Sequence, residues 1–364
     1  AKSSQLSAIG MGNNVNRQGF SINDYMNFMG GLSNFAESGG GGRMRISFDL
    51  GESGLPIGAN LNNGFTTTWA GGLNLNREFG KKTKLSASYF FNRLKNDIER
   101  TATAENLLGD ETFLSEKNEN RLSQNDNHRL NLTLRHELDS FQNLIFRTRL
   151  GFNDAGYDSE GGSETFNSSG ELENAGFRDY HSDGENLNLN STLTYRRRFK
   201  RPGRAFVADL TFGKNAIERQ GSLFSQNHYF NLPQPAADTV RQRQNYDDNA
   251  MNYGATVSFT EPVGKREYLE IQASHQNYDN KTGKDFYDIL SGGEEFFNDD
   301  LSNRYTRNYI YDRGGVNLMV NRKKWNLTTG AALQNSSIAD HQAGERDKLE
   351  KNYTAVLPNL FFHF

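Results

Sequence analysis

The sequence predicts an all-β protein, an antiparallel up-and-down transmembrane β-barrel of which about twelve strands are present. Three observations lead to this fold class. Apolar and polar residues alternate over long segments, short turns separate pairs of these segments, and the composition is polar yet rich in aromatic residues and glycine. Together they are typical of a sheet with one apolar face and one face in contact with water.

The composition excludes several classes of protein. The 364 residues include 41 Lys+Arg and 44 Asp+Glu, a net charge of −3, whereas a general nucleic-acid binder needs a basic surface. The absence of cysteine excludes disulfides, thiolate metal sites and a cysteine nucleophile. Only 35% of residues are hydrophobic, but 12% are aromatic, which argues against disorder. No apolar run reaches the roughly 18–20 residues of a membrane helix.

Alternation with a period of two residues is the main evidence for strands. It extends over eight or more residues in several segments, which predicts strands with two different faces. The apolar positions include Leu85, Ala87, Tyr89 and Phe91; Leu130, Leu132 and Leu134; Leu144, Phe146, Leu150 and Phe152; Leu187, Leu189 and Leu193; Phe206, Ala208, Leu210 and Phe212; Tyr253, Ala255, Val257 and Phe259; Leu269, Ile271 and Ala273; and Val316, Leu318 and Val320.

Charged residues between these apolar positions predict what the second face contacts. Arg147 and Arg149 lie within one alternating segment, and Asp209 and Glu270 lie within two others. A charge in mid-strand needs water, a partner or a polar lumen. We therefore expect one face in lipid and the other in a lumen. The residues expected to face lipid are Leu130, Leu132, Leu134, Leu187, Leu189 and Leu193, and those expected to face the lumen are Asn131, Thr133, Asn188 and Asn190.

Short turns alternate with long polar segments along the chain, as at the two rims of an outer-membrane barrel. The predicted tight periplasmic turns are Gly80–Lys82, Asp139–Gln142, Lys200–Arg204, Gly264–Arg266 and Arg322–Lys324. The predicted long extracellular loops include Thr101–Asn127, Ser159–Gly184 and Gly221–Gln244.

The whole chain, 1–364, is expected to be one domain, with a first strand near Gln5–Val15 and a last strand at Tyr353–Phe364. Closure into a barrel is expected because each unpaired backbone group in lipid costs several kcal/mol. Aromatic residues near strand ends are expected to form interfacial girdles. These are Trp69, Phe79, Tyr89, Phe90, Phe141, Tyr195, Phe199, Tyr268 and Trp325.

An ordered set of short motifs resembles the TonB-dependent-receptor-like outer-membrane β-barrel family of the Bacteroidota. The motifs are Asn13–Ser21, Asp24–Phe28, Gly39–Gly42, Ala70–Leu75, Ser88–Asn92, His128–Leu132, Thr260–Lys265, and Asn352–Tyr353 leading to Leu357–Leu360. The resemblance implies a receptor of about 22 strands with an N-terminal plug, which imports a nutrient using energy from the TonB–ExbB–ExbD complex.

The chain departs from this family pattern in two respects. No segment resembling a plug or an energy-coupling motif precedes Ala1, and the family's Leu-Pro motif, here Leu357-Pro358, normally lies in mid-barrel. We therefore expect a partial barrel domain with no plug domain, about the first half of the barrel. TonB–ExbB–ExbD would then act through parts missing from this chain. The remaining expected partners are outer-membrane lipid and an unknown nutrient ligand, with no nucleic acid.

No motif in the sequence predicts a catalytic, cofactor or metal site, and the ligand-binding residues are unknown. The seven histidines, 128, 136, 181, 228, 275, 341 and 363, lack metal-ligand spacing. The acidic segments Tyr278–Asp285 and Asn298–Asp300 and the pair Glu294-Glu295 are better interpreted as solvated loops. Gly39–Gly42 lacks the context of a phosphate loop. Cations of the tight turns are candidates for lipid-phosphate contacts: Lys81, Lys82, Arg201, Arg204, Lys265, Arg266, Lys323 and Lys324.

Three functional hypotheses follow. The first is part of an outer-membrane TonB-dependent receptor for nutrient uptake, without enzymatic activity and without a cofactor. The second is a complete twelve-strand outer-membrane barrel, either a passive channel or a hydrolase, with Phe364 as its aromatic terminal residue. The third is a soluble extracellular β protein that binds glycans. Pairing of the first strand with the last would favour the second hypothesis over the first.

Overall fold

The alternating segments form long antiparallel strands in the computed structural model, which describes residues 4–14, 36–39, 43–46, 64–108, 111–231, 236–342 and 349–364. Among these residues no helix is long and apolar enough to span a membrane. The strands are β1 Ser4–Asn13, β2 Ala36–Gly39, β3 Arg43–Ile46, β4 Phe65–Phe79, β5 Thr83–Leu108, β6 Glu111–Glu137, β7 Gln142–Phe166, β8 Leu172–Arg198, β9 Ala205–Tyr229, β10 Ala236–Pro262, β11 Glu267–Ile289, β12 Glu295–Phe297, β13 Asn303–Asn321, β14 Asn326–Gln342 and β15 Leu349–His363.

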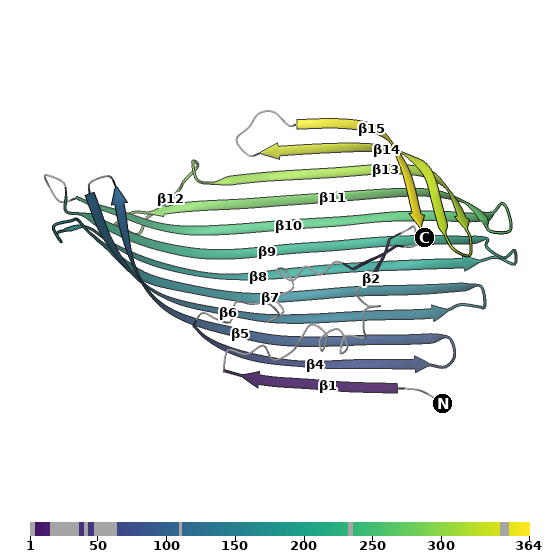
Figure 1. The fold of residues 1–364 in the computed structure, drawn as a ribbon, viewed down its shortest axis with the longest axis horizontal. Coiled ribbons are helices and arrows are strands. Elements are labelled where there is room, and N and C mark those ends of the chain that lie inside the picture. The colour runs from purple at the N-terminus through teal and green to yellow at the C-terminus, as the bar shows by residue number, and fades with distance from the viewer. Residues whose placement is uncertain are drawn as a thin grey trace.

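Thirteen of these strands form one up-and-down sheet, as the sequence predicts. The order is β1-β4-β5-β6-β7-β8-β9-β10-β11-β13-β14-β15, and the short β12 pairs with β11 (Figure 1). Strands β2 and β3 form a separate hairpin. In the described part of the chain β1 pairs with β4 and β15 pairs with β14, and the two edge strands do not pair with each other. The described strands therefore do not form the closed twelve-strand barrel of the second hypothesis.

The five predicted tight turns are confirmed, and they all lie at one rim of the sheet. They connect β4 to β5, β6 to β7, β8 to β9, β10 to β11 and β13 to β14, on the right-hand side of Figure 1. Gly80 has φ +64° and Gly203 has φ +87°, a left-handed conformation that glycine adopts without steric cost.

The long polar segments predicted as extracellular loops are mostly strand, so this prediction is wrong. In Ser159–Gly184, strand β7 continues to Phe166 and β8 begins at Leu172. In the other two segments, β5 continues to Leu108 and β6 begins at Glu111, and β9 continues to Tyr229 and β10 begins at Ala236. The reason is physical. Beyond the membrane both faces of a strand are in water, so hydrophobic alternation disappears from the sequence while the backbone ladder continues.

The register places the predicted lipid-facing and lumen-facing residues on opposite faces of the sheet, as expected. Residues that pair directly across neighbouring strands lie on the same face. One cross-strand row is Leu85, Leu134, Phe146, Leu193 and Leu210. The adjacent row, on the other face, is Ser86, Thr133, Arg147, Thr192 and Thr211.

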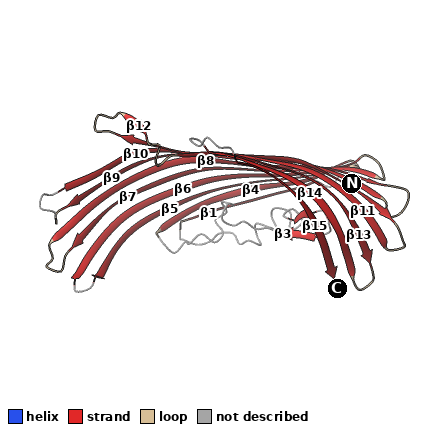
Figure 2. Cartoon of the chain, turned by 90° about the horizontal axis from the view of Figure 1, so that it is seen from above, coloured by secondary structure: helices blue, strands red, loops and turns tan. Residues whose placement is uncertain are grey.

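The sheet is strongly curved (Figure 2), and the exposed fractions of its side chains identify the apolar face as the convex side. Side chains on the inside of a curved sheet crowd together, whereas those on the outside spread apart. Leu73, Leu210 and Ile271 of the apolar face are 52%, 54% and 54% exposed, while Ile145 and Thr194 of the polar face are 2% exposed. At the depth of Leu134, Phe146 and Leu193 the convex side is apolar and the concave side carries Thr133, Arg147 and Thr192, an arrangement that needs lipid outside and water inside.

The width of the convex apolar band matches a membrane. On β7 it extends from Leu144 to Phe152, about nine residues, which covers roughly 23 Å for strands tilted as in outer-membrane barrels. A row of acidic residues on five neighbouring strands marks the edge of the band away from the turns. This convex row is Asp126, Asp154, Glu185, Glu218 and Asp247. Strands of 25 to 27 residues therefore extend far beyond the lipid.

The aromatic girdle predicted from the sequence is only partly formed. Trp69, Phe79, Tyr89 and Tyr195 share the convex face with the leucines, because they pair in register with convex residues. Phe90 and Tyr268 lie on the concave face, one residue out of phase, and Phe90 is 1% exposed. Position near a strand end is therefore not sufficient to place an aromatic residue in the girdle, because a shift of one residue along the strand moves the side chain to the other face of the sheet.

Ion pairs hold the strand extensions together beyond the lipid band. Arg93 forms a two-pronged pair with Asp126, at 2.7 and 2.5 Å. His181 lies between two carboxylates, with Nδ1 2.5 Å from Asp158 and Nε2 2.7 Å from Asp183. Hydrogen bonding to Asp158, and then to Asp183, raises the pKa of His181.

We expect arginine to be tolerated very differently at two adjacent positions of β6. Arg at Leu132, on the convex face within the apolar band, should lower the free energy of unfolding by about 2–4 kcal/mol. Arg at Thr133, on the concave face, should lower it much less. Reversible unfolding from lipid vesicles measures both. Equal losses at the two positions would contradict a lipid-facing convex side.

Labelling should distinguish the two rims in intact cells. Gly203 is a poor cysteine site, because a Cβ there would lie 2.6 Å from Tyr268. We therefore expect cysteine at the exposed Lys200, in the same tight turn, to be shielded from a membrane-impermeant maleimide. Cysteine at Ser168, in the turn between β7 and β8, should react. The reverse pattern would invert the assignment of periplasmic and extracellular rims.

The bridge at His181 should make the β7–β8 extension sensitive to pH. A raised pKa means that the charged bridge is fully present below the ordinary pKa of about 6.5 and is lost as the pH rises through the higher, folded-state value. Hydrogen-exchange protection of this hairpin, corrected for intrinsic rates, should fall over that range. His181→Gln should remove the pH dependence, and an unchanged profile would exclude the bridge as its cause.

Candidate functional site

The concave wall of the sheet is the candidate functional site, and amide side chains make up much of it. Asn92, Asn127, Asn153 and Asn186 lie directly opposite one another on β5, β6, β7 and β8. Asn153 Nδ2 donates to Asn127 Oδ1 at 2.8 Å. Amides both donate and accept hydrogen bonds, so this wall can contact polar solutes without selecting a charge.

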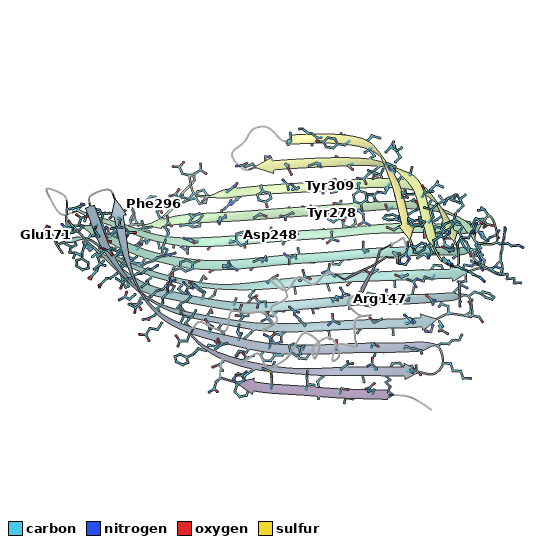
Figure 3. All side chains as sticks on the ribbon, viewed as in Figure 1. Arg147, Glu171, Asp248, Tyr278, Phe296 and Tyr309 are labelled. Carbon is cyan, nitrogen blue, oxygen red and sulfur yellow. The ribbon has the colours of Figure 1, made fainter. Side chains whose placement is uncertain are left out.

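Arginines cover the part of the wall that lies behind the lipid band. Arg147 lies between the convex Phe146 and Thr148, on the concave face, and its position is seen in Figure 3. It lies within electrostatic range of Arg135, Arg149 and Arg196. The sequence predicted that the charges of this strand face a lumen, and the register agrees.

Three tyrosines form a cluster on the concave face of β11 and β13. Tyr278 and Tyr309 lie opposite each other and stack, with ring centroids 5.9 Å apart and planes at 27° (Figure 3). Tyr311 lies 5.8 Å from Tyr309 and 6.4 Å from Tyr278. Tyr278 is 42% exposed, so an aromatic surface faces the concave side.

Polar groups fix this tyrosine cluster. The Arg313 guanidinium lies 5.3 Å from the centre of the Tyr311 ring, and its Nε donates to Gln334 Oε1 at 2.9 Å. Gln334 Nε2 donates to the Tyr309 hydroxyl at 3.3 Å. Sequence analysis did not single out these tyrosines. The available signal was the spacing of Tyr309, Tyr311 and Arg313, which puts all three on one face of a strand.

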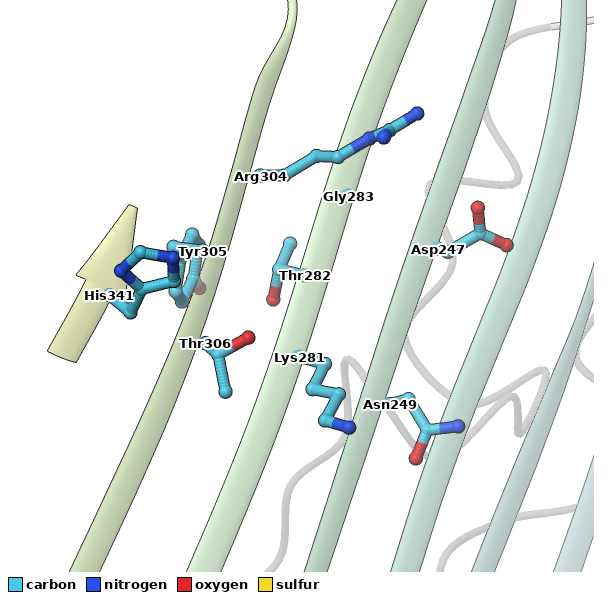
Figure 4. Close-up of a pocket in the computed structure, with 9 residues that line it drawn as sticks. All are labelled: Asp247, Asn249, Lys281, Thr282, Gly283, Arg304, Tyr305, Thr306 and His341. Carbon is cyan, nitrogen blue, oxygen red and sulfur yellow. The ribbon is translucent and has the colours of Figure 1, made fainter. Parts of the chain in front are cut away.

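A groove of about 290 Å³ lies near the strand ends remote from the turns (Figure 4). It is hollow between Asp247 and Arg304 because Gly283, which lies between them in the register, has no side chain. Arg304 pairs with Asp285 through two hydrogen bonds of 2.7 and 2.6 Å. Lys281 and Asp247 also have opposite charges. The groove is thus close to neutral, and its lining residues lie mainly on the convex face.

The cations of the tight turns bind neighbouring turns to one another. Arg201 and Arg204 of one turn both contact Glu261, each at 2.6 Å. Arg322 contacts Glu267 of the preceding hairpin. Lys82 Nζ donates to the Leu138 carbonyl at 3.0 Å. These contacts connect neighbouring turns of the rim, between residues that lie about 60 positions apart in the chain.

Several of the remaining sequence motifs lie within strands or form internal contacts in the described part of the chain. Tyr278–Asp285, predicted as a loop, lies within β11. Glu295 pairs with Arg243 at 2.6 Å, and Asn298 closes its own loop by accepting the Leu301 N–H at 3.0 Å. Within the described residues no group of three or more His, Cys, Asp or Glu side chains could hold a metal ion. Most of the motifs between Asn13 and Gly42 lie outside the described residues.

Comparison with known proteins supports the membrane assignment. Residues 197–364, a little under half of the chain, match the profile of the Outer membrane protein beta-barrel family. No curated protein matches the sequence. Among solved structures, the beta domain of the Bordetella autotransporter BrkA is 14% identical and covers 82% of this chain and 92% of its own, but at a TM-score of 0.18 it carries no structural argument.

The matched segment begins at the end of β8 and includes β9 to β15, and it therefore contains strands with the same two faces as the rest of the sheet. The protein is accordingly a bacterial outer-membrane protein with an antiparallel up-and-down sheet, and its residues 197–364 resemble the outer membrane protein beta-barrel family.

Proposed function

We propose that the chain is part of an outer-membrane receptor that takes up a nutrient, with a polar concave wall along which the ligand passes. The observation that gives most support is that the two faces of the sheet differ in side-chain polarity at the same depth in the membrane. Behind the lipid-facing Leu134, Phe146 and Leu193 the wall carries Thr133, Arg147 and Thr192. Such polar groups at membrane depth need a water-filled lumen.

The proposal includes energy coupling through TonB, ExbB and ExbD, as the resemblance of the sequence motifs implies. It assigns no catalytic step to the chain. The strand extensions, which project beyond the lipid band and carry the ion pairs of His181 and Arg93, form the extracellular surface that a ligand meets first.

Uptake by cells tests the proposal. Deleting the gene from its native bacterium should slow growth when a required nutrient is limiting, and the full-length gene should restore growth. Uptake of that nutrient should stop when a protonophore collapses the proton gradient that energises TonB.

Two results would contradict the proposal. Growth that is unaffected under every limitation would exclude nutrient uptake. Uptake that depends on the gene but continues in the presence of the protonophore would instead indicate a passive channel. A point variant on the concave wall, such as Arg147→Gln, distinguishes a direct role of the wall from a loss of expression, because the amount of protein in the outer membrane can be measured in the same cells.

A further inference from the structure

Five arginines gather on the concave wall at the depth of the lipid band, and we call them the arginine patch. They come from three neighbouring strands, and their face follows from the register with the concave residues described above. The patch consists of Arg129 and Arg135 on β6, Arg147 and Arg149 on β7, and Arg196 on β8.

Few carboxylates lie near the arginine patch to balance its charge. On the same part of the concave wall the described residues include Asp209 on β9, which is within electrostatic range of Arg147, and Glu137 at the turn end of β6. Asp209 also accepts a hydrogen bond from Thr194 Oγ1 at 2.5 Å. Lys84, the cation opposite Arg135, pairs with Glu78 at 2.9 Å. Five guanidinium groups thus face two carboxylates.

Two members of the patch, Arg147 and Arg196, form no ion pair within the described part of the chain. Arg147 nevertheless interacts with Arg135, Arg149 and Arg196, all of the same charge. Like charges that lie close together on one face of a sheet repel each other, and a guanidinium group does not lose its proton in a protein. An anion bound between these groups would remove the repulsion.

The chemistry of the patch selects the kind of anion. A guanidinium group presents its N–H donors as a planar fork, which matches the two oxygens of a carboxylate or of a phosphate. Neutral donors surround the patch: Thr133 and Thr192 lie opposite Arg147, and Asn131 and Asn190 lie opposite Arg149. These groups can contact further oxygens of the same ligand.

From this arrangement we propose that the arginine patch binds an oxyanionic solute, one that carries carboxylate or phosphate groups, and that the transported nutrient belongs to this class. The second half of the proposal rests on the proposed function. The first half concerns binding alone and does not require transport.

Binding of citrate and of inorganic phosphate to the protein expressed from the full-length gene, folded in detergent micelles at low salt, tests the proposal by calorimetry. We expect both probes to bind, and a neutral polyol of similar size not to bind. Arg147→Gln should weaken citrate binding about tenfold, equivalent to about 1.4 kcal/mol. The citrate affinity of Arg147→Lys should lie between those of the wild-type protein and Arg147→Gln, because lysine keeps the positive charge but lacks the planar fork of N–H donors. Higher salt should weaken binding to the wild-type protein by screening.

The matched control is Arg197→Gln. Arg197 lies on the convex face of β8, opposite Phe206, so this change removes the same charge from the other face of the sheet and should leave citrate binding unchanged. Circular dichroism and heat-modifiable gel mobility check that each variant folds. If Arg147→Gln does not fold, Arg147→Lys and the salt dependence of the wild-type protein still decide the question.

Three outcomes would overturn the proposal. One is citrate binding that is equal in the wild-type protein and in folded Arg147→Gln. Another is equal binding of citrate and the neutral polyol. The third is no citrate binding to the wild-type protein together with reduced stability of Arg147→Gln, which would mean that a carboxylate of the polypeptide itself occupies the patch. Citrate binding without energised uptake would instead contradict the proposed function and leave the anion site in place.

Discussion

Backbone hydrogen bonding across neighbouring strands is the interaction on which the rest of this structure depends. In lipid no water can replace a missing partner, so each N–H and C=O group must find one in the adjacent strand. The ladder from β1 to β15 does this for the inner strands β4 to β14, and it fixes one register across the whole sheet. Because side chains alternate between faces, the register then decides at every position whether a residue meets lipid or the concave side.

The charge distribution follows from this division. Within the lipid band of β7, charged groups are confined to the concave face, where Arg147 and Arg149 lie behind leucines and phenylalanines. Beyond the band the restriction ends, and acidic residues appear on the convex face as a row across five strands. The change of side-chain chemistry along a single strand therefore records the position of the membrane surface.

Outside the lipid the same backbone ladder continues, but the side-chain contacts between neighbouring strands are of a different kind. There, ion pairs such as Arg93–Asp126 and Arg304–Asp285 connect neighbouring strands, in place of apolar contacts with lipid. Exposed ion pairs contribute little stability individually. The continuity of the backbone ladder is thus the main support of the extensions, and their side chains remain available for contact with solutes. Function on this scaffold is accordingly expected at the concave wall and at the projecting strand ends.

The sequence by itself determined the fold class, the tight turns and the face of each alternating residue, because a period of two together with glycine and polar turn residues is local information. Leu132 and Thr133 could be assigned to opposite faces without coordinates. The tertiary structure alone decided the length of the strands, since polar extensions such as Ser159–Phe166 show no hydrophobic period although their backbones remain paired. It alone brought Tyr278 to Tyr309 and Arg147 to Arg196, because contacts between strands depend on register, and register is a property of the whole sheet.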